Sequence, residues 1–289
     1  MADLTKLIDI TRISNKYCFK SIETWALDAI QEYINRKPSP VFNMLPSTPS
    51  YTFIPTSGLA SITTPEPEVL QENTAQLVRL VRLAQMCNHE RLLTTMIGIL
   101  RQMMTLNLKY AYLAMTLADE LNLRELRGAA YLEVMQRAVV VARSQVVEES
   151  NAEDVTVEGD IDEEGRLVVT PAQRLRLLSG YYRLSMAWER LRVSPLTFDH
   201  APSCGATWHQ HGCTQSWLEF WKERSRSDAV LNLGLADVVG RLKAIQKQFD
   251  QWGSASYMHH DCRMAAKRSV QERIHKIEDT LSDYFTDEA

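Results

Sequence analysis

Cysteine and histidine residues are concentrated in two short segments of this chain, each placed just before a predicted helix. A structural zinc ion is held by four sulfur or nitrogen ligands arranged as a tetrahedron, on segments that can fold around it. Two segments that supply two ligands each would meet this requirement, and the second pair has the spacing of a C-x-x-C knuckle. The predicted ligands are Cys204, Cys213, His259 and Cys262. Four protein ligands would leave the ion no open position, so the site would hold the fold together and would not catalyse a reaction.

The same two segments contain histidines that could replace one of these ligands, namely His209, His211 and His260. Cys204 and Cys213 are separated by more residues than paired zinc ligands usually are. One alternative interpretation is therefore a group of loop histidines, a pair of reduced thiols and a cysteine at the start of a helix. Another is an enzyme that uses this cluster to bind a catalytic metal.

Composition and motifs exclude several other functions. The chain has no Gly-rich phosphate loop, no G-x-S-x-G elbow and no H-E-x-x-H motif. Its formal net charge of −4 argues against a broad phosphate-binding surface, so nucleic acid is not an expected partner. No apolar run is long enough to cross a membrane, and the first residues do not resemble a secretory signal. An odd number of cysteines, five, favours a reducing compartment, so the cytoplasm or the nucleus is expected.

The elements that must position the cluster are predicted to be helices. Three stretches share an apolar pattern with steps of nine and then eight residues: Ile13, Ile22 and Ile30; Leu83, Leu92 and Leu100; Leu117, Leu126 and Val134. An eight-residue step is roughly two helical turns, so its ends share a face, and the nine-residue step crosses a polar break between two helices. Three copies imply stacked helical hairpins that bury their seams against one another. The predicted fold class is all-α, in two lobes.

Composition divides the chain into five segments. Residues 1–36 are predicted to form a helix pair, and residues 37–69 a Pro/Ser/Thr-rich insertion. Residues 70–143 are predicted to form helical hairpin repeats. An acidic linker follows at residues 144–169, and residues 170–289 are predicted to form a helical region with the Cys/His cluster. The acidic linker is expected to act as a hinge between the lobes. Within it, residues 155–157 and 167–169 could pair as a small β-hairpin.

The C-terminal region is predicted to begin with a helix at Pro171, because Thr170 can cap it and Gln173 can bond back to the cap. Further helices are predicted over 214–225, 235–249 and 262–285. The stripe expected to be buried on the first of these helices is Leu175, Leu178, Tyr182, Ser185 and Trp188. Trp25, Trp217 and Trp221 also lie on apolar stripes, and core positions are expected for them.

Several of these segments resemble a known family. The run from Leu7 to Tyr17, LIDITRISNKY, followed by IETWALDAI from Ile22 to Ile30, is similar to the last two helices of a BTB/POZ domain in fungal, basidiomycete-type BTB proteins. Residues 78–84 and 112–118 resemble the helices that follow in that family, and residues 281–285 resemble its ending. The predicted ligand pairs match where the family places cysteine pairs, although the family usually has Cys where His259 stands. Most of the N-terminal BTB fold, with its strands and dimerising first helix, has no counterpart in this sequence.

The resemblance implies a non-enzymatic protein–protein interaction module or adaptor. Its expected partners are proteins, with a ubiquitin-ligase scaffold among them, and neither membranes nor nucleic acids. One structural zinc ion is the only cofactor that the sequence predicts.

Overall fold

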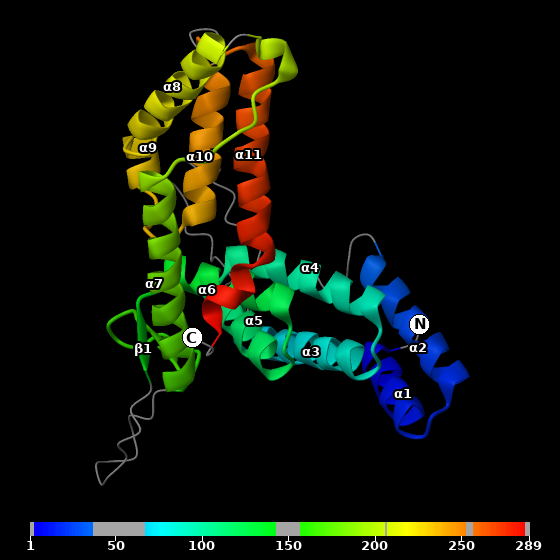
Figure 1. Ribbon diagram of the computed structural model, residues 1–289. Coiled ribbons are helices and arrows are strands. Elements are labelled where there is room, and N and C mark those ends of the chain that lie inside the picture. The colour runs from blue at the N-terminus through cyan, green and yellow to red at the C-terminus, as the bar shows by residue number, and fades with distance from the viewer. Residues whose placement is uncertain (1–2, 37–66, 143–156, 206, 253–256, 287–289) are drawn as a thin grey trace, which may run out of the picture. The chain divides into compact units, whose positions relative to one another are not determined.

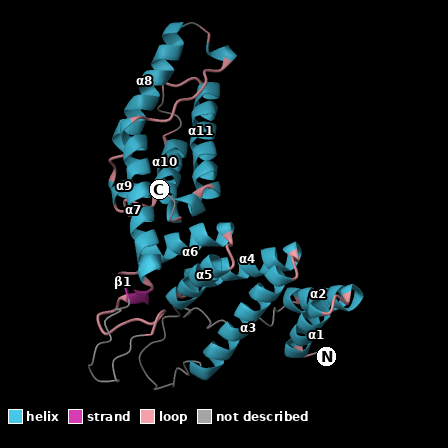
Figure 2. Cartoon of the chain, turned by 60° about the horizontal axis from the view of Figure 1, so that its bottom comes forward, coloured by secondary structure: helices cyan, strands magenta, loops and turns pink. Residues whose placement is uncertain are grey.

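A computed structural model describes residues 3–36, 67–142, 157–205, 207–252 and 257–286. Within these ranges the chain is almost entirely helical, with one short sheet of two strands (Figures 1 and 2). The predicted all-α fold class is therefore confirmed. Most of the predicted Pro-rich insertion and the first part of the acidic linker lie outside the described residues. None of the described helices combines the length and apolar character needed to cross a membrane.

The chain divides into two compact units, Met1–Leu123 and Arg124–Ala289. The first unit contains helices α1 (Leu4–Lys16), α2 (Lys20–Asn35), α3 (Pro67–Met86), α4 (Glu90–Leu106) and α5 (Leu108–Glu120). The second begins with α6 (Arg124–Arg137) and contains every residue of the predicted Cys/His cluster.

The three predicted repeats are built around turns of the same construction. In each turn one residue has a left-handed backbone: Cys18 with φ 59°, Asn88 with φ 50° and Asn122 with φ 53°. The next amide donates to the carbonyl five residues back, from Phe19 to Ser14 (2.8 Å), His89 to Ala84 (2.9 Å) and Leu123 to Ala118 (3.0 Å). This is the bond of a Schellman motif, which satisfies a carbonyl at the end of a helix. The three turns occupy equivalent positions in the predicted repeat, which supports the repeat from backbone geometry alone.

Burial of the repeat differs between its copies. In the second and third copies all marker residues are buried, with at most 2% exposed, but in the first copy only Ile30 is buried. Ile13 and Ile22 are 57% and 47% exposed, and Trp25 is exposed beside them. The prediction of a core position for Trp25 is therefore wrong. α2 is apolar on two faces, and the face that packs inside this unit is that of Ala26, Leu27 and Ile30.

The second unit contains the only sheet within the described residues. Strand β1 (Val140–Ala142) pairs in parallel with β2 (Leu167–Val169), with Val140 opposite Leu167. On its other edge, β2 forms one antiparallel bridge, between Leu167 and Ile161, so the segment that turns back onto β2 at that bridge is not the predicted 155–157 segment. Of residues 155–157, only Val157 is described, and it lies in no strand.

Helix α7 (Pro171–Val193) begins as predicted but buries a different face. Thr170 Oγ1 accepts a hydrogen bond from the amide of Gln173, whose side chain accepts one from the amide of Thr170, both at 3.1 Å. The buried residues of α7 are Gln173, Leu177, Gly180, Leu184, Trp188 and Leu191, so of the predicted stripe only Trp188 is buried. Gly180 explains the choice of face, because a Cβ there would collide with the buried ring of Phe285.

The remaining elements are η1 (Pro202–Cys204), α8 (Thr207–Arg224), α9 (Asp228–Leu231), α10 (Val238–Gln251), α11 (His260–Asp279) and η3 (Leu281–Phe285). Helices α8, α10 and α11 run side by side, and α7 contacts α10 (Figures 1 and 2). Between them, Trp217 and Trp221 are buried as predicted, and Trp217 packs on Phe249 with ring centroids 5.1 Å apart. α8 begins seven residues earlier than the predicted helix, so Cys213 lies on a helix and not in a loop.

Candidate metal centre

The three cysteines of the predicted cluster come together from three elements of the second unit. Cys204 is the last residue of η1, Cys213 lies in the second turn of α8, and Cys262 lies in the first turn of α11. All three side chains are buried, and all three are free thiols. η1, α8 and α11 therefore approach one another where these sulfur atoms lie.

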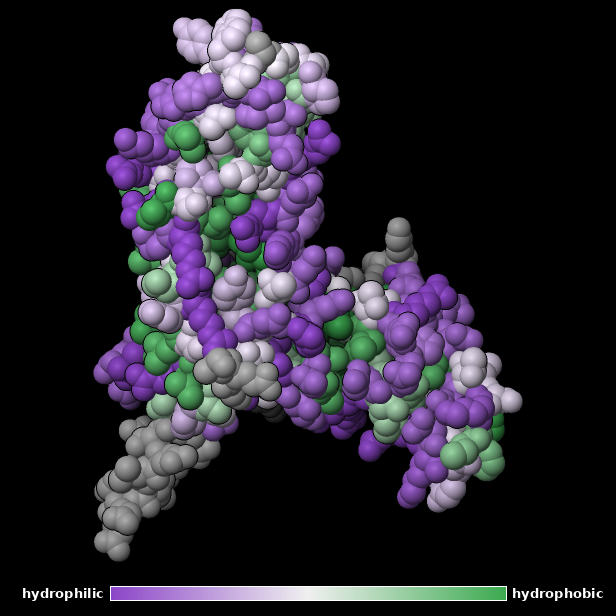
Figure 3. Space-filling model, viewed as in Figure 1, coloured by the Kyte–Doolittle hydropathy of each residue, from purple (hydrophilic) through white to green (hydrophobic). Residues whose placement is uncertain are grey.

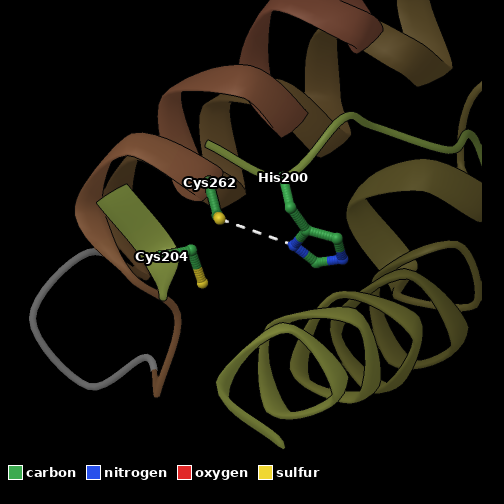
Figure 4. Close-up of side chains that lie close together, drawn as sticks. All are labelled: His200, Cys204 and Cys262. Carbon is green, nitrogen blue, oxygen red and sulfur yellow. Dashed lines mark hydrogen bonds between the residues drawn. The ribbon is translucent and has the colours of Figure 1, made fainter. Parts of the chain in front are cut away.

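A histidine outside the predicted set completes the group. The ligand atoms of His200, Cys204 and Cys262 all lie within 4.8 Å of one another. Figure 4 shows the His200 ring directed at the sulfur of Cys262, with Nδ1 3.5 Å from that atom. His200 belongs to the loop between α7 and η1, so a fourth segment enters the site.

Cys213 is adjacent to this trio. Its Sγ lies 3.8 Å from Sγ of Cys204, and it accepts a hydrogen bond of 3.2 Å from the backbone amide of His259. His259 thus approaches the cluster through its main chain. Its ring atom Nδ1 is buried and has no hydrogen-bond partner within the described part of the chain.

Two of the separations in the cluster match edges of a zinc tetrahedron. With Zn–S bonds of about 2.3 Å and Zn–N bonds of about 2.0–2.1 Å, tetrahedral angles place two sulfurs about 3.8 Å apart and a sulfur and a nitrogen about 3.5–3.6 Å apart. The Cys204–Cys213 and Cys262–His200 separations are 3.8 Å and 3.5 Å. A disulfide would need about 2.05 Å between its sulfurs. The trio of His200, Cys204 and Cys262 therefore supplies three candidate ligands, and Cys213 lies next to Cys204 but outside the group whose ligand atoms are all within 4.8 Å of one another.

Residues next to the ligands fix their orientation. His200 Nε2 lies 3.0 Å from the hydroxyl of Thr214, so the tautomer with its proton on Nε2 leaves Nδ1 available to a metal. Ser203 donates to the carboxylate of Asp261 at 2.5 Å, which ties the neighbour of Cys204 to the neighbour of Cys262. This hydrogen bond, together with one from His260, lowers the pKa of Asp261.

Burial determines the protonation state of the Cys204 thiol when no cation is bound. Burial, followed by hydrogen bonds with Cys262 and Cys213, raises the pKa of the Cys204 thiol to about 12. Without a cation the thiol therefore stays neutral at physiological pH. Thiolates bind zinc and are stabilised by its charge, so a bound dication would reverse this preference.

The other histidines of the two segments are not brought to the cluster. His209 and His211 are exposed on α8, and exposed His260 lies 3.3 Å from Asp261. Sequence reasoning overlooked His200, although the spacing His200-x-x-x-Cys204 is one that zinc ligands commonly have.

Comparison of the chain with protein-family models, curated proteins and solved structures gives no match. The BTB/POZ resemblance therefore stays a prediction. The side chains of His200, Cys204 and Cys262 could together hold a metal ion, with Cys213 as the adjacent fourth donor.

Proposed function

We propose that this chain is a non-enzymatic protein-interaction module, of the adaptor type implied by the BTB/POZ resemblance, whose second unit is closed by one structural zinc ion. The ligands are Cys204, Cys213, Cys262 and His200. The module acts inside the cell, where thiols remain reduced.

The Cys/His donor set carries this proposal. His200, Cys204 and Cys262 offer three ligand atoms within 4.8 Å of one another, and Cys213, with its sulfur 3.8 Å from that of Cys204, would supply the fourth and leave no position for water or substrate. A catalytic zinc ion has three protein ligands and an open position. The proposed ion would instead join η1, α8 and α11, which are short or separated in sequence.

Metal content tests the zinc ion. Protein purified without added metal is expected to contain one zinc per chain, and its cobalt-substituted form is expected to show the intense absorption of tetrahedral cobalt bound to thiolates. Cys262→Ser and His200→Ala should lose the metal, whereas His259→Ala should keep it. Cys18→Ser removes an exposed thiol in the first unit and serves as the matched control.

The metal site would be rejected if elemental analysis finds no zinc and a strong chelator also leaves the melting temperature unchanged. A cobalt spectrum that shifts on addition of cyanide would reveal an open position and would favour a metal-dependent enzyme.

Affinity purification of the full chain from its native cell, followed by mass spectrometry, tests the interaction function. Reproducible recovery of a ubiquitin-ligase scaffold would support the adaptor type. Failure to recover any reproducible protein would contradict the interaction module itself.

A further inference from the structure

Helix α7 has a second apolar face, opposite in part to the one that it buries. Leu175, Leu178, Tyr182 and Met186 are 65%, 57%, 65% and 39% exposed. Their spacing of three, four and four residues places them on one side of the helix, and we call this row the α7 stripe. Apolar and hydrophilic side chains alternate over α7 on the left of Figure 3. Single exposed apolar residues are ordinary, but a continuous row on a helix marks a surface that binds something.

The α7 stripe borders a hollow in the surface of the same unit. A cavity of about 440 Å³ lies between α7 and the end of α11 with η3. Tyr182 and Met186 belong both to the stripe and to the cavity wall, where Arg183, Arg190 and Tyr284 join them. A raised apolar row beside a hollow suits an occupant that inserts large side chains, as an amphipathic helix does.

The charge of α7 indicates the chemistry of the occupant. The helix has five arginines, Arg174, Arg176, Arg183, Arg190 and Arg192, and one acidic residue, Glu189, which is bonded to Arg192 at 2.7 Å. Arg176, Arg183 and Arg190 recur every seven residues, about two helical turns, and so follow one edge of the stripe. Asp283, the acid in the cavity wall, is paired with Arg124. α7 therefore carries an excess of positive charge beside the stripe.

We propose that the α7 stripe is the docking site for an amphipathic helix of a partner protein, with acidic residues beside its apolar face. Apolar residues of that helix cover Leu175, Leu178 and Tyr182, and its carboxylates face the arginine row. This inference rests on the proposed interaction function and specifies its surface.

Other occupants fit the surface less well. A second copy of the chain would bring the arginines of two α7 helices together, which is unfavourable. Nucleic acid would be attracted by the positive charge of α7 but would leave the leucines exposed to water. A bilayer is flat and would leave the cavity beside Tyr182 unfilled.

Synthetic helices test the proposal directly. The probe is a fluorescent peptide of three heptads with Leu at a and d and Glu at e and g, and its control has Lys in place of each Glu. The full chain is expected to bind the acidic peptide at least about ten-fold more tightly than the basic one, as measured by fluorescence anisotropy.

Variants locate the binding. Leu175→Ser with Leu178→Ser, and separately Arg176→Glu with Arg190→Glu, are each expected to weaken binding by about ten-fold or more. Ile13→Ser with Ile22→Ser removes exposed apolar residues from the first unit and should leave the affinity unchanged. Because every substituted apolar residue is exposed, circular dichroism should show native helicity in all of these proteins.

Four results would overturn the proposal: equal affinity for both peptides, full binding by the α7 variants, self-association abolished by these variants, or stripe-dependent binding to phosphatidylserine vesicles or duplex DNA. Partners captured equally by wild-type protein and by the α7 variants would also overturn it, while leaving the interaction function standing. Capture of no partner by either protein would reject the interaction function itself.

Discussion

The left-handed turn residue is asparagine in two repeats but cysteine in the first, where Cys18 is exposed. A left-handed backbone brings Cβ too close to the following carbonyl oxygen, and asparagine tolerates this conformation better than most residues do. Cys18→Asn is therefore expected to raise the free energy of unfolding by about 0.5–1 kcal/mol, as measured by urea denaturation. The reciprocal change, Asn88→Cys, should lower it by a similar amount. Destabilisation by Cys18→Asn would show that the thiol makes an interaction that offsets the backbone strain.

Glu23 links the stability of the first unit to pH. Burial raises the pKa of this carboxyl, but hydrogen bonds from Lys20 (2.9 Å) and Asn15 (3.2 Å) outweigh burial and lower the pKa below 4.5. A lowered folded-state pKa contributes stability above the unfolded pKa, and that contribution is lost as pH falls through the folded value. Glu23→Gln should therefore destabilise the protein at pH 7, and its difference from wild type should shrink below about pH 4.

Urea denaturation at a series of pH values measures this difference. The control is Glu32→Gln, which removes an exposed carboxylate from the same helix and should cost little at any pH. A wild-type advantage over Glu23→Gln that stays constant down to pH 3 would contradict the assigned role of the carboxylate.

At the candidate site, the sequence predicts that cysteines and histidines form a cluster, but it does not predict which histidine joins the cysteines. The three cysteines near the starts of predicted helices are visible in the sequence, and the structure places them close together and buried. Which histidine joins them depends on how the loop after α7 folds back, and no local pattern encodes that path. His200 is held there by Thr214 and by Phe198, whose ring centroid lies 5.0 Å from its own. Such contacts are known only once the helices are packed.

Among the elements, periodicity predicts which helices exist but not which face each one buries. α7 has apolar residues on two faces, so the pattern of Leu175, Leu178 and Tyr182 is as regular as that of Leu177, Leu184 and Leu191. The packing of η3 against α7 determines which face of α7 is buried, and η3 is distant from α7 in sequence. Capping is local, which explains why the start of α7 at Thr170 could be predicted from four residues.

Gly180 tests this packing argument. In an exposed helix, Gly→Ala would stabilise by about 1 kcal/mol, because alanine is the better helix former. At Gly180 the added methyl group would collide with Phe285, whose ring also stacks on Tyr131 at 5.2 Å between centroids. Gly180→Ala should therefore lower the free energy of unfolding by about 1–3 kcal/mol.

Thermal unfolding compares this variant with Gly98→Ala, a matched change in α4, where the added methyl group meets no atom within 4 Å. The control should stabilise by about 0.5–1 kcal/mol. The same sign of effect for both variants would mean that η3 does not determine the buried face of α7.

For the whole molecule, the division into two units makes the consequences of metal removal local. All proposed ligands belong to Arg124–Ala289, and five of the six tryptophans lie there as well. Zinc that binds only the folded unit stabilises it by about 4 kcal/mol when free zinc exceeds its Kd a thousand-fold. Chelation should therefore lower the midpoint of the unfolding transition that is followed by tryptophan fluorescence.

Hydrogen exchange locates the effect of chelation along the chain. Amides of α8 and α11 should lose protection when the metal is removed, because these helices carry Cys213 and Cys262. Amides of α3 and α4 should keep theirs, because the first unit has its own buried core in Leu80, Val81, Met96 and Leu100. A uniform loss of protection in both units would mean that they unfold as one cooperative body, so that the ion stabilises the entire chain. Unchanged protection in α8 and α11 would mean that the sulfur cluster holds those helices together without any ion.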